Sequence, residues 1–185
     1  MNSIDWLYSL QRFGIKPGLA RINRFLRRLG HPERNYRTIL VAGTNGKGST
    51  AAALTSILVE AGYKTGLYTS PHILNFNERI RIGRQRLIPD DFIRDFIQEH
   101  KSFITQNEIT FFESVTAMAF YYFACERVDY GVIEVGMGGR LDATNIVKPC
   151  LSIITSISYD HTDLSLIHIS EPTRPLYISY AVFCL

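Results

Sequence analysis

The segment Gly43–Ser49 has the composition of a phosphate-binding turn. Its glycines let backbone N–H groups approach phosphate oxygens closely. Lys47 adds a positive charge, and the hydroxyl of Ser49 or Thr50 could contact phosphate or Mg²⁺. The spacing departs from the common GxxxxGK[ST] pattern, because two residues separate the first two glycines and Gly48 follows the lysine. A tight turn alone would account for glycines, but a strand, turn, lysine, hydroxyl and helix in succession favour phosphate binding.

Glu134 is the second candidate, since it ends an apolar run that is predicted to be a strand over residues 130–135. An acidic residue in a buried strand is costly unless it is paired or coordinates a cation. Ligands of open α/β sheets bind at the carboxyl ends of strands. A Mg²⁺ ligand is therefore favoured over a structural salt bridge.

Two histidine-containing segments follow predicted strands, Ser70–His72 and Asp160–Asp163. Taken alone, His72 or His161 would more often be an ordinary loop residue. In a parallel sheet, however, both segments emerge at the same edge as the glycine-rich turn. This shared edge favours one site lined by all of them.

The elements that position these residues alternate along the chain. Continuous apolar runs predict strands over residues 38–42, 65–69, 130–135 and 151–157. Apolar residues at helical spacing predict helices over residues 6–13, 19–29, 49–61, 90–97 and 110–123. This alternation predicts an α/β fold whose parallel sheet is covered by helices on both faces. In the second helix, the arginines between the apolar positions suit a solvated face, with contact to a phosphate or another anion as the less favoured alternative; they are Arg21, Arg24, Arg27 and Arg28.

Composition narrows the class of protein. The chain has 185 residues, about one domain, of which 46% are hydrophobic and 20% charged, so a disordered or collagen-like chain is excluded. A net charge of +3 is too small to argue for nucleic acid. Three cysteines without CxxC spacing indicate neither a disulfide framework nor a zinc site. No signal-peptide pattern and no apolar run near the roughly 20 residues of a membrane span are found, so we expect a cytoplasmic protein.

Five segments in order resemble one enzyme family: AGTNGKGS, YTSPHILNFNERIRI, FFESVTAMAF, IEVGMGGRLDATN and TSISYDHTDL. They are similar to folylpolyglutamate synthase and the bifunctional dihydrofolate synthase/folylpolyglutamate synthase of the Mur-ligase superfamily. The resemblance implies the P-loop-type central ATPase domain of that superfamily. It implies a ligase that uses ATP to phosphorylate a carboxyl group of dihydropteroate or folate. The amine of L-glutamate then attacks the acyl phosphate. It also implies a monomer that binds small molecules, without nucleic-acid or membrane partners.

The same resemblance implies roles for individual residues. The ATP phosphates would be held by Thr44, Asn45, Gly46, Lys47, Gly48 and Ser49. The Mg²⁺ ligands would be Ser70, Glu134 and His161, the last through a neutral ring nitrogen. Lys47, Glu134 and His161 would be the catalytic residues. The substrate would be bordered by Thr110, Phe111, Phe112 and Glu113 and by Leu141, Asp142 and Ala143. Glu113 also has the spacing of a capping box, which is compatible with that role, and Asn75–Arg81 resemble a mobile substrate loop.

We expect the resemblance to cover residues 1–164 as part of an N-terminal ATP-binding domain, without the family's C-terminal domain. Residues 165–185 are expected to be a non-native tail, because Leu164–Arg174 and Ile178–Leu185 resemble translated sequencing-adapter DNA. Two alternatives remain open. One is a non-catalytic nucleotide-binding fragment. The other is a sister Mur-type ligase of cell-wall precursors, against which the SPH and FFES segments argue.

Overall fold

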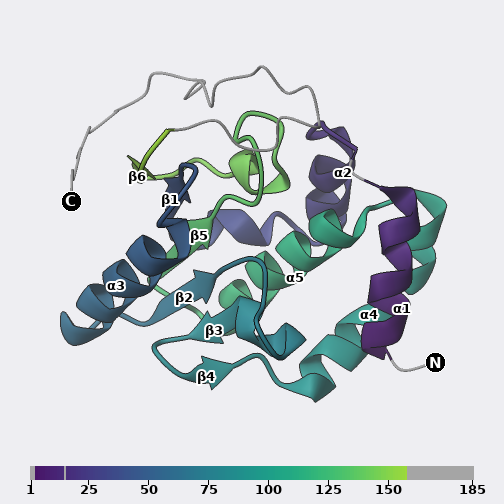
Figure 1. Ribbon diagram of the computed structural model, residues 1–185. Helices are drawn as coiled ribbons and strands as arrows, with labels where there is room; N and C mark the ends of the chain where they lie inside the picture. The colour runs from purple at the N-terminus through teal and green to yellow at the C-terminus, as the bar shows by residue number, and fades with distance from the viewer. Residues whose placement is uncertain (1–2, 15, 158–185) are drawn as a thin grey trace.

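The computed structural model describes residues 3–14 and 16–157, and these form an α/β fold around a six-stranded sheet (Figure 1). The strand order is β4-β3-β2-β5-β1-β6. The strands are β1 (Arg37–Ala42), β2 (Thr65–Tyr68), β3 (Ile80–Ile82), β4 (Arg86–Leu87), β5 (Tyr130–Glu134) and β6 (Leu151–Ile154). The expectations for His161 and for residues 165–185 lie outside the described residues.

Four strands confirm the predicted parallel sheet, and two correct it. β2, β5, β1 and β6 pair in parallel and are the four apolar runs of the sequence. β3 and β4 are antiparallel additions that the sequence analysis missed. They have only three and two residues and carry arginines (Arg81 and Arg86). β3 buries Ile80 and Ile82, whereas both residues of β4 are exposed, as suits a strand at the edge of the sheet.

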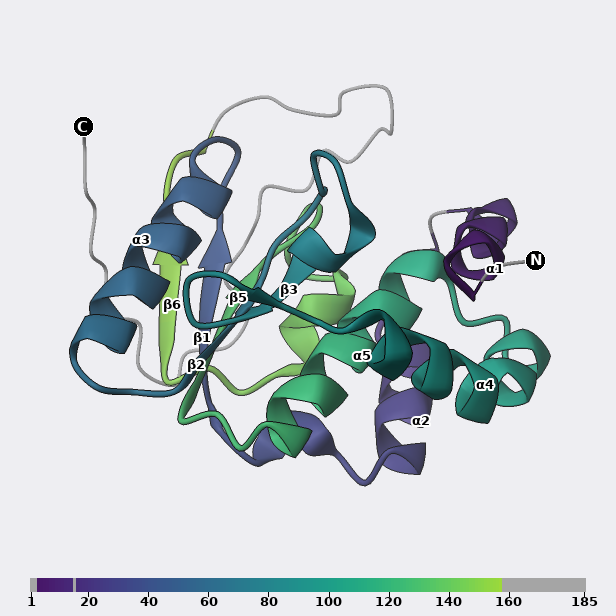
Figure 2. The same cartoon turned by 90° about the horizontal axis from the view of Figure 1, so that it is seen from below.

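Helices cover both faces of the sheet, as predicted. Figure 2 shows α3 alone on one face, with α5 on the other and α2, α4 and α1 beyond it. The α-helices are α1 (Ser3–Ser9), α2 (Ala20–Arg28), α3 (Lys47–Glu60), α4 (Asp90–Gln106) and α5 (Phe111–Cys125). Short 3-10 turns are η1 (Leu10–Phe13), η2 (Pro32–Arg34), η3 (Phe76–Arg79) and η4 (Ala143–Ile146). Among the described residues no helix combines the length and the apolar character needed to cross a membrane.

The core lies mainly between the sheet and α5. Ten of the 15 residues of α5 are buried, so this helix is apolar almost all round. The opposite helix, α3, differs: its buried residues are the small Ala51 and Thr55, while Ile57 is 64% exposed. Small side chains let α3 approach the sheet closely, where Ala51 packs with Val41 and Leu67. The spacing of the large apolar residues therefore predicts that this segment is a helix, but it does not identify the side of the helix that is most buried.

The parallel strands end together, and this positions the site. Val41 of β1 is in register with Glu134 of β5, and Ala42 is in register with Ile154 of β6. On the other side of β5, Tyr68 of β2 is in register with Ile133. The segments that follow these strands therefore gather at one edge of the sheet, as the sequence predicts.

Candidate active site at the carboxyl edge of the sheet

The glycine-rich turn joins β1 to α3 and is held by the end of β6. Gly46 precedes the helix with φ 79°, a left-handed conformation that favours glycine. The amide of Thr44 donates to the Ser156 carbonyl (2.7 Å), and that of Asn45 donates to Ser156 Oγ (3.2 Å). Thr155 Oγ1 donates to the Asn45 carbonyl (2.6 Å). The sequence analysis missed Thr155 and Ser156, although two hydroxyl residues directly after a buried strand were a usable signal.

Lys47, the first residue of α3, turns its ammonium group back into the turn. Its Nζ donates to the carbonyls of Gly43 (2.9 Å) and Thr44 (3.1 Å). The cation is thereby fixed beside the first amides of the helix, which have no partner within the helix. Positive charge and free N–H groups at one point form an anion site.

Glu134 lies beneath this turn, where β5 ends, and is only 6% exposed. The amide of Ser70 donates to its Oε2 (3.0 Å). Burial raises the pKa of Glu134, while the Ser70 amide and the charge of Lys47 act in the opposite direction. A Cβ on Gly48 would lie 3.5 Å from both carboxylate oxygens. The glycine that interrupts the usual motif thus leaves no side chain between α3 and this carboxylate.

These residues fit a divalent cation. A desolvated carboxylate beside a serine offers the hard oxygen donors that Mg²⁺ prefers, and the α3 side of the carboxylate carries no side chain at Gly48. Ser70 and Glu134 are brought together by the Ser70 amide contact. The third predicted ligand, His161, lies outside the described residues. Within residues 3–14 and 16–157, no three His, Cys, Asp or Glu side chains form a cluster that could hold a metal.

The predicted substrate segment at Thr110 begins α5 with the capping box expected from the sequence. Glu113 Oε2 accepts from the Thr110 amide (2.8 Å) and hydroxyl (2.9 Å), and the Glu113 amide donates to Thr110 Oγ1 (3.3 Å). Glu113 is 3% exposed, so its carboxylate serves the helix start. Phe111 and Phe112 follow, both half-buried.

The second predicted segment, Leu141–Ala143, lies against the first. Asp142 fastens its own loop: Oδ2 accepts from the Met137 amide (2.8 Å), and Oδ1 from the Thr144 amide (2.9 Å) and hydroxyl (2.5 Å). Burial raises the pKa of Asp142, and these hydrogen bonds oppose that shift. A Cβ on Gly136 would lie 2.5 Å from Phe112 Cζ. The structure therefore brings Phe112 and the Asp142 loop together.

His72 contributes to a different part of the edge than Glu134. Arg79 Nε donates to its Nδ1 (2.8 Å), so a neutral His72 carries its proton on Nε2, 3.1 Å from the Tyr8 hydroxyl. Burial and the charge of Arg79 lower the pKa of His72. Tyr8 also stacks on Phe111 at 5.5 Å, and the Arg79 guanidinium lies 5.4 Å from that ring. Tyr8, from α1, was not predicted from the sequence. Arg79 lies in the segment Asn75–Arg81, expected to be a substrate loop, which instead forms η3 and the start of β3.

A surface hollow of about 310 Å³ lies at the opposite end of the sheet. Arg37 and Tyr130, the first residues of β1 and β5, line it together with Tyr63 and Asp129. The Arg37 guanidinium already donates to the Tyr130 hydroxyl (3.0 Å). None of the residues predicted to act in the site lines this hollow.

The edge geometry can be compared with known proteins. The Mur ligase middle domain family matches residues 41–166. The chain belongs to the Mur ligase family. Its match begins in β1, just before the glycine-rich turn, and includes Ser70, Glu134 and both predicted substrate segments. The predicted resemblance is thereby confirmed.

Similar proteins of the Mur ligase family agree in sequence and in fold. The dihydrofolate synthase/folylpolyglutamate synthase of Bacillus subtilis is 45% identical over 166 residues, which are 86% of this chain and 39% of that protein. The folylpolyglutamate synthase structure from Thermotoga maritima has a TM-score of 0.78 at 42% identity, covering 85% of this chain and 38% of that one. E. coli FolC in complex with DHPP and ADP has a TM-score of 0.77 at 38% identity, covering 88% and 40%. The chain thus spans about two fifths of the length of these relatives.

Proposed function

We propose that this chain is the ATP-binding part of a ligase that joins L-glutamate to dihydropteroate or folate. The observation that carries the proposal is the carboxyl edge of the sheet, where the glycine-rich turn faces the buried Glu134 across Gly48. Similar proteins support the ligands: one structure is E. coli FolC with DHPP and ADP, and another is an FPGS-AMPPCP-folate complex. Each is 38% identical to this chain, and they cover 88% and 87% of it.

The proposed reaction activates a carboxylate. An oxygen of the substrate carboxylate attacks the γ-phosphorus of ATP, the bond to the β–γ bridging oxygen breaks, and ADP leaves. The amine nitrogen of glutamate then attacks the acyl carbon and loses its proton, and phosphate leaves with the former carboxylate oxygen. The products are an amide, ADP and phosphate. Such a phosphoryl transfer depends on positioning and on charge stabilisation.

The residues at the edge supply those requirements. The amides of the first turn of α3 and the ammonium group of Lys47 bind phosphate oxygens, which take the place of the carbonyls of Gly43 and Thr44. Ser70 and Glu134, with His161, would hold Mg²⁺, which would supply positive charge against the phosphates. Gly48 places no side chain against the Glu134 carboxylate.

The substrate side of the site is formed by Thr110–Phe112 and Leu141–Ala143. The half-buried rings of Phe111 and Phe112 provide stacking surface for a pterin. Leu141 is 52% exposed and is the accessible residue of its segment, since Asp142 and Ala143 are buried. Asp142 therefore acts by holding the loop, and Leu141 is the residue that a substrate would meet.

The test is a substrate panel with the complete gene product. We expect ATP-dependent attachment of glutamate to dihydropteroate or folate, detected by mass spectrometry, and no product with a cell-wall nucleotide precursor. Lys47→Ala and Glu134→Ala should each abolish it. Lys64→Ala is the matched control, because this surface lysine pairs with Glu126 at the far edge of the sheet (2.9 Å). Ligation of the cell-wall precursor alone would refute the substrate class, and full activity of Glu134→Ala would refute the site.

We also propose that residues 165–185 are translated adapter sequence rather than native protein, and that the 185-residue chain binds nucleotide without ligating. The family match ends at residue 166, which supports the boundary. Sequencing of unamplified genomic DNA across the codon for Leu164 tests this. A different reading frame after that codon is expected, and a genomic sequence that encodes residues 165–185 would overturn the proposal. Ligase activity of the purified 185-residue chain would refute the second part.

A further inference from the structure

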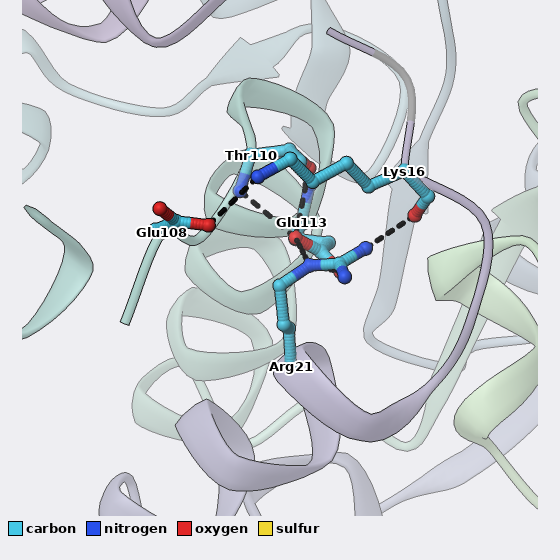
Figure 3. Close-up of polar contacts among 5 residues, drawn as sticks. All are labelled: Lys16, Arg21, Glu108, Thr110 and Glu113. Atoms are coloured by element: carbon cyan, nitrogen blue, oxygen red, sulfur yellow. Dashed lines mark hydrogen bonds and ion pairs between the residues drawn. The ribbon is translucent and has the colours of Figure 1, made fainter. Parts of the chain in front are cut away.

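Arg21 is the one arginine of α2 that reaches a buried carboxylate. Its Nε lies 3.1 Å from Oε1 and 3.2 Å from Oε2 of Glu113, and the side chain is 23% exposed (Figure 3). The same guanidinium donates to the carbonyl of Lys16. Arg24, one turn further along α2, instead donates to the half-buried Asn107 (3.0 Å). For Arg21, the expected solvated face is therefore wrong, because its guanidinium pairs with a buried carboxylate of the protein itself.

The short turn Lys16–Gly18 is fastened at three points. Arg21 holds the Lys16 carbonyl, and Lys16 Nζ pairs with Glu108 (2.8 Å), just before α5. The amide of Gly18 donates to the carbonyl of Leu141 (3.3 Å). The turn thereby connects the start of α5 with the loop of Asp142, the two segments proposed to border the substrate.

Arg21 and Glu113 depend on each other. Glu113 Oε2 caps α5 by accepting from the Thr110 amide and hydroxyl. The Glu113 side chain is almost inaccessible to solvent. A buried carboxylate is costly without a cation, and the Arg21 guanidinium compensates its charge while donating to a second acceptor, the Lys16 carbonyl. Lysine offers one point charge and cannot hold both the carboxylate and the Lys16 carbonyl in this geometry.

We propose that Arg21 is a positioning residue for the substrate site, because it locks the Lys16–Gly18 turn to the first turn of α5 through Glu113. The inference rests on the proposed function for the identity of the substrate. Its structural part does not, since it concerns which backbone groups are held together. Arg21 acts on Thr110–Phe112 and Leu141 without contacting the reacting atoms.

Hydrogen exchange of the 185-residue chain tests the positioning without any substrate. Arg21→Ala should speed exchange of the Gly18 and Thr110 amides about tenfold or more. The segment of Gly18 then loses the contact that holds the Lys16 carbonyl, and Glu113, the acceptor of the Thr110 amide, loses the cation that fixes it. Arg24→Ala is the matched control and should leave both amides at the wild-type rate. Glu113→Gln should act like Arg21→Ala, and the double variant should be no worse than either. Wild-type exchange of both amides in Arg21→Ala would overturn the proposal.

Kinetics of the complete gene product tests the consequence for the substrate. Arg21→Ala should raise KM for dihydropteroate or folate about tenfold and leave KM for ATP unchanged, with Arg21→Lys intermediate. Equal losses for both substrates would indicate only a structural role and overturn the proposal. The two proposals can fail separately. If Arg21→Ala speeds exchange at Gly18 and Thr110 but the wild-type protein attaches no glutamate, the positioning role stands and the proposed function is refuted.

Discussion

The substitution Gly48→Ala should have opposite effects on the stability of α3 and on the binding of ATP with Mg²⁺ beside Glu134. The new methyl group would lie 3.5 Å from both Glu134 oxygens, an ordinary contact distance, so the fold can accept it. Alanine in place of a helical glycine adds up to about 0.5–1 kcal/mol of stability. The methyl group also covers the side of the carboxylate that faces α3. We therefore expect affinity for ATP with Mg²⁺ to fall at least about tenfold, which corresponds to about 1.4 kcal/mol.

Calorimetric titration with ATP and Mg²⁺, together with urea unfolding, measures both effects on the same variant. Gly62→Ala is a control in which stability, rather than nucleotide affinity, is expected to fall. Gly62 follows α3 at φ 89° with open space around it, so alanine there should cost about 1 kcal/mol of stability and leave nucleotide affinity unchanged. Wild-type affinity in Gly48→Ala would refute the reasoning about Glu134. A loss of stability in that variant would show that the methyl group does not fit.

Three further predictions concern other parts of the fold. Stability should fall as the pH drops below the ordinary histidine value of about 6.5, because burial lowers the pKa of His100 and the folded state therefore favours its neutral form. Within the described part of the chain neither ring nitrogen of His100 makes a hydrogen bond, and the nearest carboxylate oxygen, Glu99 Oε1, is 4.0 Å from Nε2. His100→Phe should therefore weaken this dependence in thermal unfolding measured between pH 5 and 8. Gly136→Ala should displace Phe112, cost about 1–3 kcal/mol in urea unfolding and weaken folate binding more than ATP binding. Thr155→Val removes the hydroxyl that holds the Asn45 carbonyl and should weaken ATP binding, measured by titration, with little change in folate binding.

The fold was predictable where burial is continuous. Strands such as 38–42 and 130–135 are apolar because both of their faces are covered, and the sequence shows this directly. β3 and β4 were not predictable, because a strand of two or three residues with an arginine has no periodicity to detect. β3 pairs with β2, and β4 pairs with β3, so neither strand forms without its neighbour.

The local structure of the candidate site was predictable where one motif carries it, as for the turn that ends at Lys47 and the capping box of Thr110 and Glu113. It was not predictable where the partner comes from another element. Arg21 looks like a member of a solvated arginine face until α5 places Glu113 beside it. Ser156 holds the glycine-rich turn from a position 111 residues away from Asn45. Long-range contacts of this kind produce no regular spacing of residues that could be recognised in the sequence.

The central claim is that the edge at Glu134 activates a carboxylate with ATP. The most direct measurement uses dihydropteroate or folate whose carboxylates carry heavy oxygen, with ATP, Mg²⁺, L-glutamate and the complete gene product. Because the attacking carboxylate oxygen leaves with the phosphate, we predict that heavy oxygen appears in the released phosphate, in step with the amide formed. Glu134→Ala should release none. Amide formation that leaves all of the label in the product would contradict the account.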